Sequence, residues 1–297
     1  MKKYFSVSAK AYDSAYDFEV YCAASLDRPK DHAVMFMNQV NRHRVSCLEN
    51  VRSCIVFHPE DLSIPENIRA HNVCIPTRDP RLSYCLFFRD NQIRYDPPKE
   101  NVSVVDGAYI AEGAKIGKNV TIMPMAYIGG EVEIGDNSYI GVGARLVGAV
   151  HIGANVCIRE NAVIGADGLS TDRDEDGRAA TMPQFGGVWI EDDVQIGAMT
   201  VIARGAIDDT YIGRGVKVDN STFISHNVSI GEDTFIVGES IFFGGSSTGK
   251  QAFISGNATI RNKVHVGNKA MVGFGAVVTK HVEDGATVLG NPAHPKK

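Results

Sequence analysis

A branched apolar residue recurs every six positions along the chain, from Val104 almost to the C-terminus. The first series runs through Val104, Ile110, Ile116, Ile122, Ile128, Ile134, Ile140, Leu146, Ile152, Ile158 and Ile164. The spacing breaks after Ile164 and again after Ile202, and a last series extends from Ile212 to Val278. A period of six is neither the 3.6 of a helix nor the two of a single strand. It predicts a mainly β coil of short strands and tight turns, with the apolar residues stacked inside.

A small or β-branched residue stands two positions before most of these apolar residues, as Ala126 does before Ile128. Glycine often follows the apolar residue, at positions where turn dihedrals strain other residues. The combined pattern resembles the hexapeptide-repeat family of left-handed parallel β-helices. The resemblance implies that three hexads form one eighteen-residue turn of a triangular prism. It also implies that prisms assemble as homotrimers, with ligand sites in the grooves between subunits.

The remaining segments define the expected domain organisation. Residues 1–100 lack the hexad and mix strand-like runs with helical stretches, which predicts a small α/β domain ending at Pro97 and Pro98. Residues 101–285 form the β-helix, and 286–297 a short tail. Within the β-helix, 165–189 is too polar for a prism wall and is expected to be a loop excursion.

Composition narrows the function classes. The chain has 30 Lys and Arg against 35 Asp and Glu, a net charge of -5, which gives no basic surface for nucleic acid. No apolar run reaches the length of a membrane span, and the first residues do not form an apolar leader. The six cysteines include no C-x-x-C pair. These features predict a cytoplasmic protein with reduced thiols.

The segments "GADGL", "MPQFGGVWIEDDVQIGA", "RGAIDDTYIGRGVKVDN" and "FISHNVSIG" resemble the UDP-3-O-acylglucosamine N-acyltransferases of lipid A and lipopolysaccharide biosynthesis. The resemblance implies that His226 is the catalytic histidine and Gly244 the oxyanion-hole glycine. The chemistry agrees, because an imidazole with a pKa of about 6.5 can take a proton from an attacking amine near neutral pH. Eighteen residues separate the two positions, so a regular prism places Gly244 beside His226, about 4.8 Å away along its axis.

Other residues are expected to assist at the site. Asp219, seven residues before His226, is a third catalytic candidate that can orient the imidazole or contact the amine. Asn227 is expected to bind substrate, and so is Lys263, which stands where the relatives carry a second histidine. Ala203 stands where the relatives usually carry Asp.

Residues outside the prism walls complete the expected substrate contacts. The resemblance implies that Phe36 and Asn38 in the first domain hold a uracil base, although "VNRHR" offers no aromatic residue where the family has a stacking Tyr. It further implies that the excursion arches over the donor's pantetheine arm. Gln184 and Phe185, from that excursion, are expected near bound ligand.

These features together predict an N-acyltransferase that uses acyl carrier protein or acyl-CoA as donor and the amine of a nucleotide-linked amino sugar as acceptor. No permanently bound cofactor or metal is expected. The "GNPA" ending resembles coenzyme A-dependent acetyltransferases, so a sugar O- or N-acetyltransferase of surface polysaccharide synthesis is an alternative. Two further alternatives are a zinc enzyme using His151, His226 and His265 and a non-catalytic binding module.

Overall fold

The computed structural model describes residues 3–93, 100–292 and 294–295 and divides the chain into two compact units. The first unit comprises Met1–Asp96 and Leu169–Phe185, and the second comprises Pro97–Gly168 and Gly186–Lys297. The middle of the predicted excursion therefore packs with the first unit, while both of its ends remain in the second. The predicted boundary at Pro97 and Pro98 lies outside the described residues.

The first unit is built on a four-stranded parallel sheet in the order β3-β4-β5-β6, as expected for a small α/β region. Helix α2 follows β6 directly, because the side chain of Asp79 accepts hydrogen bonds from the N–H groups of Arg81 and Leu82 and Pro80 presets the first turn. The elements are β1 (Val7–Ser8), η1 (Ala9–Ala11), β2 (Glu19–Val20), β3 (Cys22–Ala23), β4 (Ala33–Phe36), η2 (Gln39–Leu48), β5 (Ile55–Pro59), α1 (Glu66–Arg69), β6 (Val73–Thr77) and α2 (Pro80–Asp90).

An antiparallel hairpin from the excursion completes the first unit. Its strands are β18 (Thr171–Arg173) and β19 (Ala179–Thr181). Arg81 of α2 pairs with Asp172, and Arg89 pairs with Asp174 at 2.7 Å. These ion pairs explain why the polar run "STDRDED" is ordered against a helix instead of lying in a prism wall.

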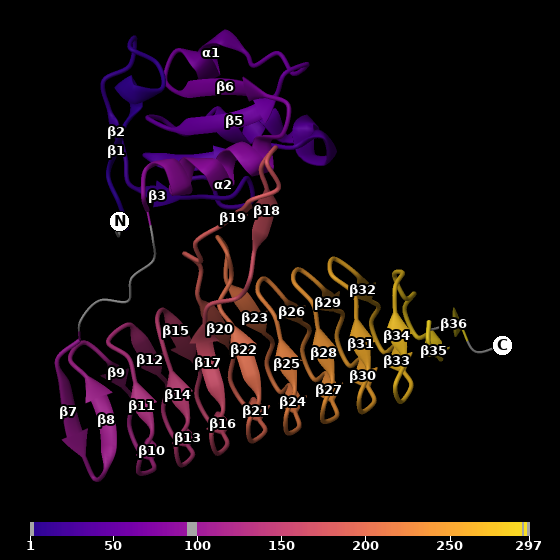
Figure 1. Cartoon of the computed structure of the whole chain (residues 1–297). Coiled ribbons are helices and arrows are strands. Elements are labelled where there is room, and N and C mark those ends of the chain that lie inside the picture. Colours follow the sequence, from indigo (N-terminus) through magenta and orange to yellow (C-terminus); the bar gives the residue numbers. More distant parts are fainter. Residues whose placement is uncertain (1–2, 94–99, 293, 296–297) are drawn as a thin grey trace. The chain divides into compact units, whose positions relative to one another are not determined.

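The second unit is a parallel β-helix whose chain visits three sheets in turn (Figure 1). Sheet I contains β7 (Val102–Val105), β8 (Ala108–Ala111), β11 (Tyr127–Ile128), β14 (Arg145–Leu146), β17 (Val163–Ala166), β22 (Val201–Ala203), β25 (Phe223–Ile224), β28 (Ile241–Phe242), β31 (Thr259–Ile260) and β34 (Val277–Val278). Sheet II contains β9 (Lys115–Ile116), β12 (Val132–Ile134), β15 (Val150–Ile152), β20 (Val188–Ile190), β23 (Thr210–Ile212), β26 (Ser229–Ile230), β29 (Ser247–Thr248) and β32 (His265–Val266). Sheet III contains β10 (Thr121–Ile122), β13 (Tyr139–Ile140), β16 (Cys157–Ile158), β21 (Gln195–Ile196), β24 (Lys217–Val218), β27 (Phe235–Ile236), β30 (Phe253–Ile254), β33 (Met271–Val272), β35 (Thr287–Leu289) and β36 (His294–Pro295).

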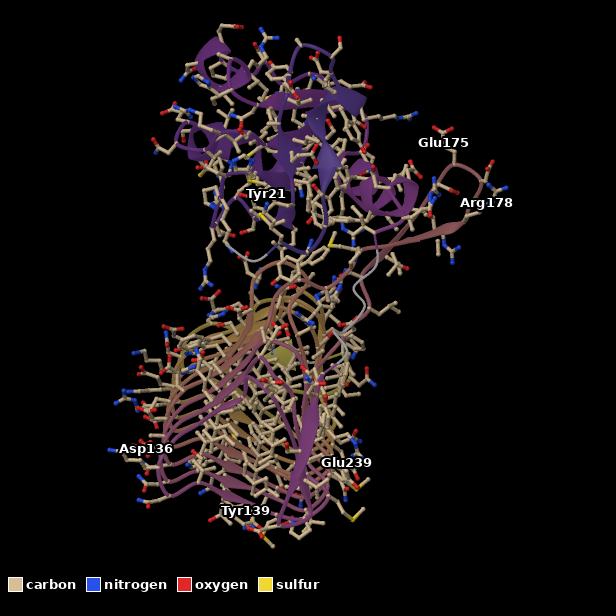
Figure 2. The ribbon with its side chains drawn as sticks, turned by 90° about the vertical axis from the view of Figure 1, so that its left-hand side faces the viewer. Tyr21, Asp136, Tyr139, Glu175, Arg178 and Glu239 are labelled. Atoms are coloured by element: carbon tan, nitrogen blue, oxygen red, sulfur yellow. The ribbon has the colours of Figure 1, made fainter. Side chains whose placement is uncertain are left out.

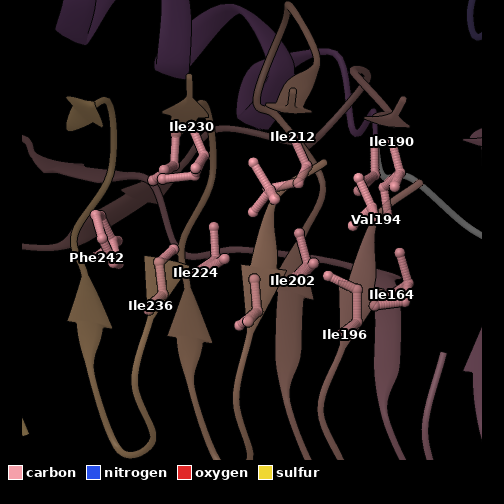
Figure 3. Packing of buried hydrophobic residues seen from close by; sticks show 14 of the residues in the cluster. Ile164, Ile190, Val194, Ile196, Ile202, Ile212, Ile224, Ile230, Ile236 and Phe242 are labelled. Atoms are coloured by element: carbon pink, nitrogen blue, oxygen red, sulfur yellow. The ribbon is translucent and has the colours of Figure 1, made fainter. Parts of the chain in front are cut away.

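The hexads fill the interior of this coil, which confirms the sequence prediction. Figure 3 shows the ladder of aliphatic side chains, in which Ile164, Ile202 and Ile224 are completely buried. Thr121 pairs with Tyr139 and Tyr139 with Cys157, so successive coils are offset by three hexads. Figure 2 shows Asp136, Tyr139 and Glu239, which lie between the inward positions, pointing away from the coil. The outward positions are therefore available for chemistry and binding.

The first hexads depart from the prediction. Val104 is 63% exposed and Ile116 is 40% exposed, although both occupy apolar positions of the repeat. The chain enters through β7, which folds back antiparallel on β8 across a turn at Asp106 and Gly107, both with positive φ. At this end of the ladder the stack begins, so the first apolar residues are covered on one side only.

Strand pairing continues past both breaks in the hexad, with one register shift between Ile164 and Ala166 at the first break. Ala154 and Asp192 are hydrogen-bonded neighbours on adjacent coils although 38 residues separate them. Ala198 and Asn220 are neighbours across 22 residues, whereas an uninterrupted coil uses eighteen. The extra residues leave the coil at corners, so the ladder resumes in register past each insertion.

Candidate active site

His226 lies on the outside of a corner of the coil. It follows β25 of sheet I and precedes β26 of sheet II, and the flanking Ile224 and Ile230 are completely buried. Because these two residues point inwards, the half-buried imidazole is carried on the outer side, as the hexad predicts. The corner can therefore present the ring to a ligand.

Two glycines lie close to the imidazole. A Cβ atom added to Gly244 would lie 2.6 Å from both Cε1 and Nε2 of His226. A Cβ atom added to Gly168 would lie 2.9 Å from the Cβ of His226 and 3.1 Å from its Cδ2. The Gly245 N–H also donates to the carbonyl of His226 at 3.0 Å. The eighteen-residue coil thus brings Gly244 beside His226 as predicted, whereas the contact with Gly168 was not foreseen.

Asn227 fixes which ring nitrogen of His226 carries the proton. Its Nδ2 donates to the carbonyl of Asp208 at 2.7 Å, and its Oδ1 accepts from the N–H of Ala206 at 3.0 Å. The amide orientation is therefore set, and the atom that lies 3.0 Å from Nδ1 of His226 is an acceptor. Nδ1 must then be the donor, which leaves the lone pair on Nε2, the nitrogen beside Gly244.

Asp219 lies at a different corner of the coil. It follows β24 of sheet III, and its carboxylate accepts from the N–H groups of Asn220 at 2.8 Å and Gly238 at 3.3 Å. The contact with Nδ1 of His226 is made instead by Asn227. Asn227, and not Asp219, is therefore the residue that contacts Nδ1 of His226.

Lys263 lies one coil beyond Gly244 and Gly245. Its N–H donates to the carbonyl of Gly244 at 3.2 Å, and a Cβ atom on Gly245 would lie 3.6 Å from its Cγ. The side chain is exposed, so its ammonium group can turn towards an anionic ligand. Ala203 is buried at the end of β22.

The excursion residues Gln184 and Phe185 are buried in the first unit. The Phe185 ring packs against the rings of Tyr4, Phe5 and Phe88, with centroids 5.1 to 5.8 Å apart. Nε2 of Gln184 donates to the carbonyl of Met182 at 3.0 Å. Packing between aromatic rings explains the position of Phe185. This position is therefore no evidence that Phe185 contacts a ligand.

Phe36 is the last residue of β4 in the first unit, and Asn38 lies two residues after it. The half-buried Phe36 ring lies 4.9 Å from the ring of Tyr84. The Asn38 side chain caps η2, where it accepts from Val40 and Asn41, and Asn41 returns a bond to the Asn38 N–H. Asn38 therefore has a structural function of its own.

Arg204 is a site residue that the sequence analysis did not single out. It is 1% exposed, and its Nε donates to the carbonyl of Gly186 at 2.7 Å. Its Nη1 lies 4.0 Å from Asp167. Partial burial raises the pKa of the Asp167 carboxyl, and the charge of Arg204 opposes that rise. A signal was present in the repeat. Ile202 and Ile224 are paired on adjacent coils, and Arg204 stands two positions after Ile202 just as His226 stands two positions after Ile224.

The described residues contain no group of three His, Cys, Asp or Glu side chains that could hold a metal ion. His151 stacks on Trp189 with ring centroids 3.7 Å apart, and Nδ1 of His265 is hydrogen-bonded to Ser247 at 2.8 Å. Both histidines belong to strands of sheet II, whereas His226 lies at a corner. The three histidines of the zinc alternative do not converge.

Comparisons with known proteins agree with the fold. Residues 113–148 and 131–166 match the bacterial transferase hexapeptide (six repeats) family. The UDP-3-O-acylglucosamine N-acyltransferase of Francisella tularensis subsp. holarctica is 54% identical over 79 residues, which are 27% of this chain and 23% of that protein. The chain thus matches about a quarter of the length of this curated relative.

Solved acyltransferase structures share the coil. The UDP-N-acetylglucosamine acyltransferase from Campylobacter jejuni has 22% identity and a TM-score of 0.58, covering 65% of this chain and 74% of that one. The UDP-N-acetylglucosamine acyltransferase from Bacteroides fragilis 9343 has 27% identity and a TM-score of 0.54, with the same coverage. Among the described residues, no helix is both long and apolar enough to cross a bilayer. Residues 113–166 of this chain thus match the bacterial transferase hexapeptide repeat, and the second unit has the fold of these solved structures.

Proposed function

We propose that the protein is an N-acyltransferase that moves an acyl group from a thioester to the amine of a nucleotide-linked amino sugar. The observation that carries the proposal is the close approach of Nε2 of His226 to the backbone of Gly244 on the next coil. The names of the similar proteins support the acyl group and the nucleotide sugar.

In the proposed reaction His226 acts as the general base. The amine nitrogen attacks the thioester carbonyl carbon while Nε2 accepts a proton from the amine. The resulting tetrahedral oxyanion accepts a hydrogen bond from the Gly244 N–H. When the intermediate collapses, the carbon–sulfur bond breaks and the imidazolium returns its proton to the thiolate. Asn227 supports this cycle, because its Oδ1 beside Nδ1 favours the tautomer that leaves Nε2 able to accept the proton.

The test is His226→Ala in the full-length protein. Turnover should fall by about 10²- to 10⁴-fold, the usual contribution of a general base, while the melting temperature stays near wild type. His265→Ala is the matched control, because His265 is an exposed histidine on sheet II of the same coil. Wild-type turnover in the His226 variant would exclude the mechanism.

The donor and acceptor are identified in the same assay. Acyl carrier protein and coenzyme A thioesters of several chain lengths should be offered with UDP-linked sugars that carry either a free amine or only hydroxyl groups. Acylation of the amine by an acyl carrier protein supports the proposed reaction. Acetylation from acetyl coenzyme A would support the acetyltransferase alternative instead. Phe36→Ala should raise the KM for the nucleotide sugar if that ring contacts the base.

The working unit is proposed to be a homotrimer. The outer side of sheet I supports this assembly, because Phe223 is 37% exposed and Val201 and Ile241 lie beside it on the two neighbouring strands. Apolar patches of this kind mark association surfaces. Light scattering should give three times the chain mass. Ile241→Asp should dissociate the assembly, whereas Ser229→Asp, at an exposed polar position of sheet II, should not.

A further inference from the structure

We propose that Arg204 is a positioning residue that fixes the two ends of the excursion and thereby holds Gly168 and Asn227 in place around His226. The inference rests on the proposed function, because it concerns the geometry of the same histidine. It starts from burial, since Arg204 is among the largest completely buried side chains of the described chain. A guanidinium group removed from water is retained only where specific partners face it.

The partners of Arg204 lie on both sides of the excursion. Its Nε donates to the carbonyl of Gly186 at 2.7 Å, where the chain returns to the coil. Its Nη1 faces Asp167 at 4.0 Å, just before the chain departs. The backbone makes the same connections, because the Arg204 N–H donates to Ala166 at 2.9 Å and the Gly186 N–H donates to Gly205 at 3.0 Å. One side chain therefore bridges the exit and the return of the inserted segment.

These contacts lead directly to His226. Gly168 follows Asp167 and is the glycine that covers one face of the imidazole. On the other side of Arg204, the N–H of Ala206 holds Oδ1 of Asn227, the atom that fixes the tautomer of His226. A displacement of Arg204 would therefore change both the space around the ring and the choice of protonated nitrogen.

The two contacts favour arginine over lysine, because one is a hydrogen bond from Nε to Gly186 and the other a longer ion pair from Nη1 to Asp167. The planar guanidinium presents Nε and Nη1 in fixed directions, so that it can meet a carbonyl and a carboxylate together. The single ammonium nitrogen of a lysine lacks this fork. Arg204→Lys should therefore behave like Arg204→Met in the assay of turnover, although the positive charge is kept.

The experiment compares Arg204→Lys and Arg204→Met with Arg214→Met, a control on an exposed arginine of the same coil. The kcat of both Arg204 variants should fall roughly 10- to 100-fold, with little change in the KM for the donor, because misplacement of a base by about 1 Å has this effect. Spectra of histidines labelled with ¹⁵N provide a readout independent of turnover. The His226 signal, assigned by its absence in His226→Ala, should show Nδ1–H in the wild type and a mixture of tautomers in the Arg204 variants.

The outcomes separate the two proposals. Wild-type kcat and an unchanged His226 tautomer in both Arg204 variants would overturn the role of Arg204 while leaving the mechanism intact. Full activity of His226→Ala would overturn the mechanism, and the tautomer measurement would still decide the role of Arg204. If the Arg204 variants do not fold, Asp167→Asn removes the exposed partner and should produce a smaller change of the same kind. An unchanged spectrum and kcat in this variant would then count against the bridge.

Discussion

At the scale of single residues, the candidate site depends on two glycines, which have no side chain. Gly168 and Gly244 approach the His226 ring so closely that neither position has room for a methyl group. The ring is held by shape on two sides and by one amide oxygen at Nδ1. A rigidly held imidazole loses little freedom when substrate arrives, which favours proton transfer.

Gly244→Ala should lower turnover by at least about 100-fold, because its methyl group would meet Nε2 of His226 at 2.6 Å and displace the ring. Gly168→Ala should lower it to a smaller extent, because the clash is with Cβ of the histidine at 2.9 Å. Gly256→Ala is the matched control, since the nearest atom to its methyl group is 3.4 Å away. Steady-state kinetics with thermal melting of all three variants provides the check, and equal losses in the control would contradict the steric explanation.

The pairing of His226 with Gly244 could be predicted because a constant eighteen-residue offset relates them. The contact of Gly168 with His226 could not, because the chain between these residues contains both insertions and no fixed spacing applies. Asp219 illustrates the same limit. Its distance of seven residues from His226 suggested proximity, but a corner of the coil separates the two positions.

At the scale of the elements, each strand is too short to be stable alone and depends on the coils above and below it. The hexad predicted this stacking correctly wherever a residue has neighbours on both sides. It could not reveal that the apolar residues of the first coil are partly exposed, because Val104 and Ile116 obey the same spacing as the buried residues. Burial at an end of the stack is decided by the fold-back of β7, and the repeat itself carries no sign of it.

Two isoleucines of the same repeat should therefore respond differently to truncation. Ile224→Ala should lower the free energy of unfolding by about 2–5 kcal/mol, because its completely buried side chain would leave a cavity. Ile116→Ala should lower it by less than about 1 kcal/mol, because Ile116 is 40% exposed. Denaturant titration of both variants measures the difference, and similar losses would mean that the end of the stack is covered in solution.

At the scale of the whole molecule, the described residues of the two units pack into separate hydrophobic clusters. Ile224 belongs to the core of the coil, whereas Met35, Val56 and Ile68 belong to the core of the first unit. The sequence predicted this division from the absence of hexads in the first hundred residues. It could not predict that residues 169–185 return to the first unit, because the ion pairs with α2 join positions that are 91 and 85 residues apart.

Acid should destabilise the first unit through His58. Burial lowers the pKa of this imidazole below its ordinary 6.5, because the charged form is disfavoured away from water. The unfolded chain then binds the proton more readily, so the contribution of His58 is full above pH 6.5 and is lost as the pH falls through and below that value. The slope cannot exceed about 1.4 kcal/mol per pH unit for one proton.

Calorimetry between pH 7.5 and 5.5 should show this loss in the transition of the first unit, and His58→Gln should reduce the slope. His71→Gln, at an exposed position of the same unit, is the control. The Ile224→Ala variant should shift only the other transition. A pH slope unchanged by His58→Gln would show that other groups govern the acid sensitivity.

The two insertions at corners of the coil have a consequence for how such a molecule changes through evolution. Since the ladder resumes in register after 22 or 38 residues as readily as after eighteen, a corner can exchange its peptide without disturbing the rungs on either side. A different peptide inserted at a corner can then give a new specificity, while the β-helix that carries His226 stays unchanged.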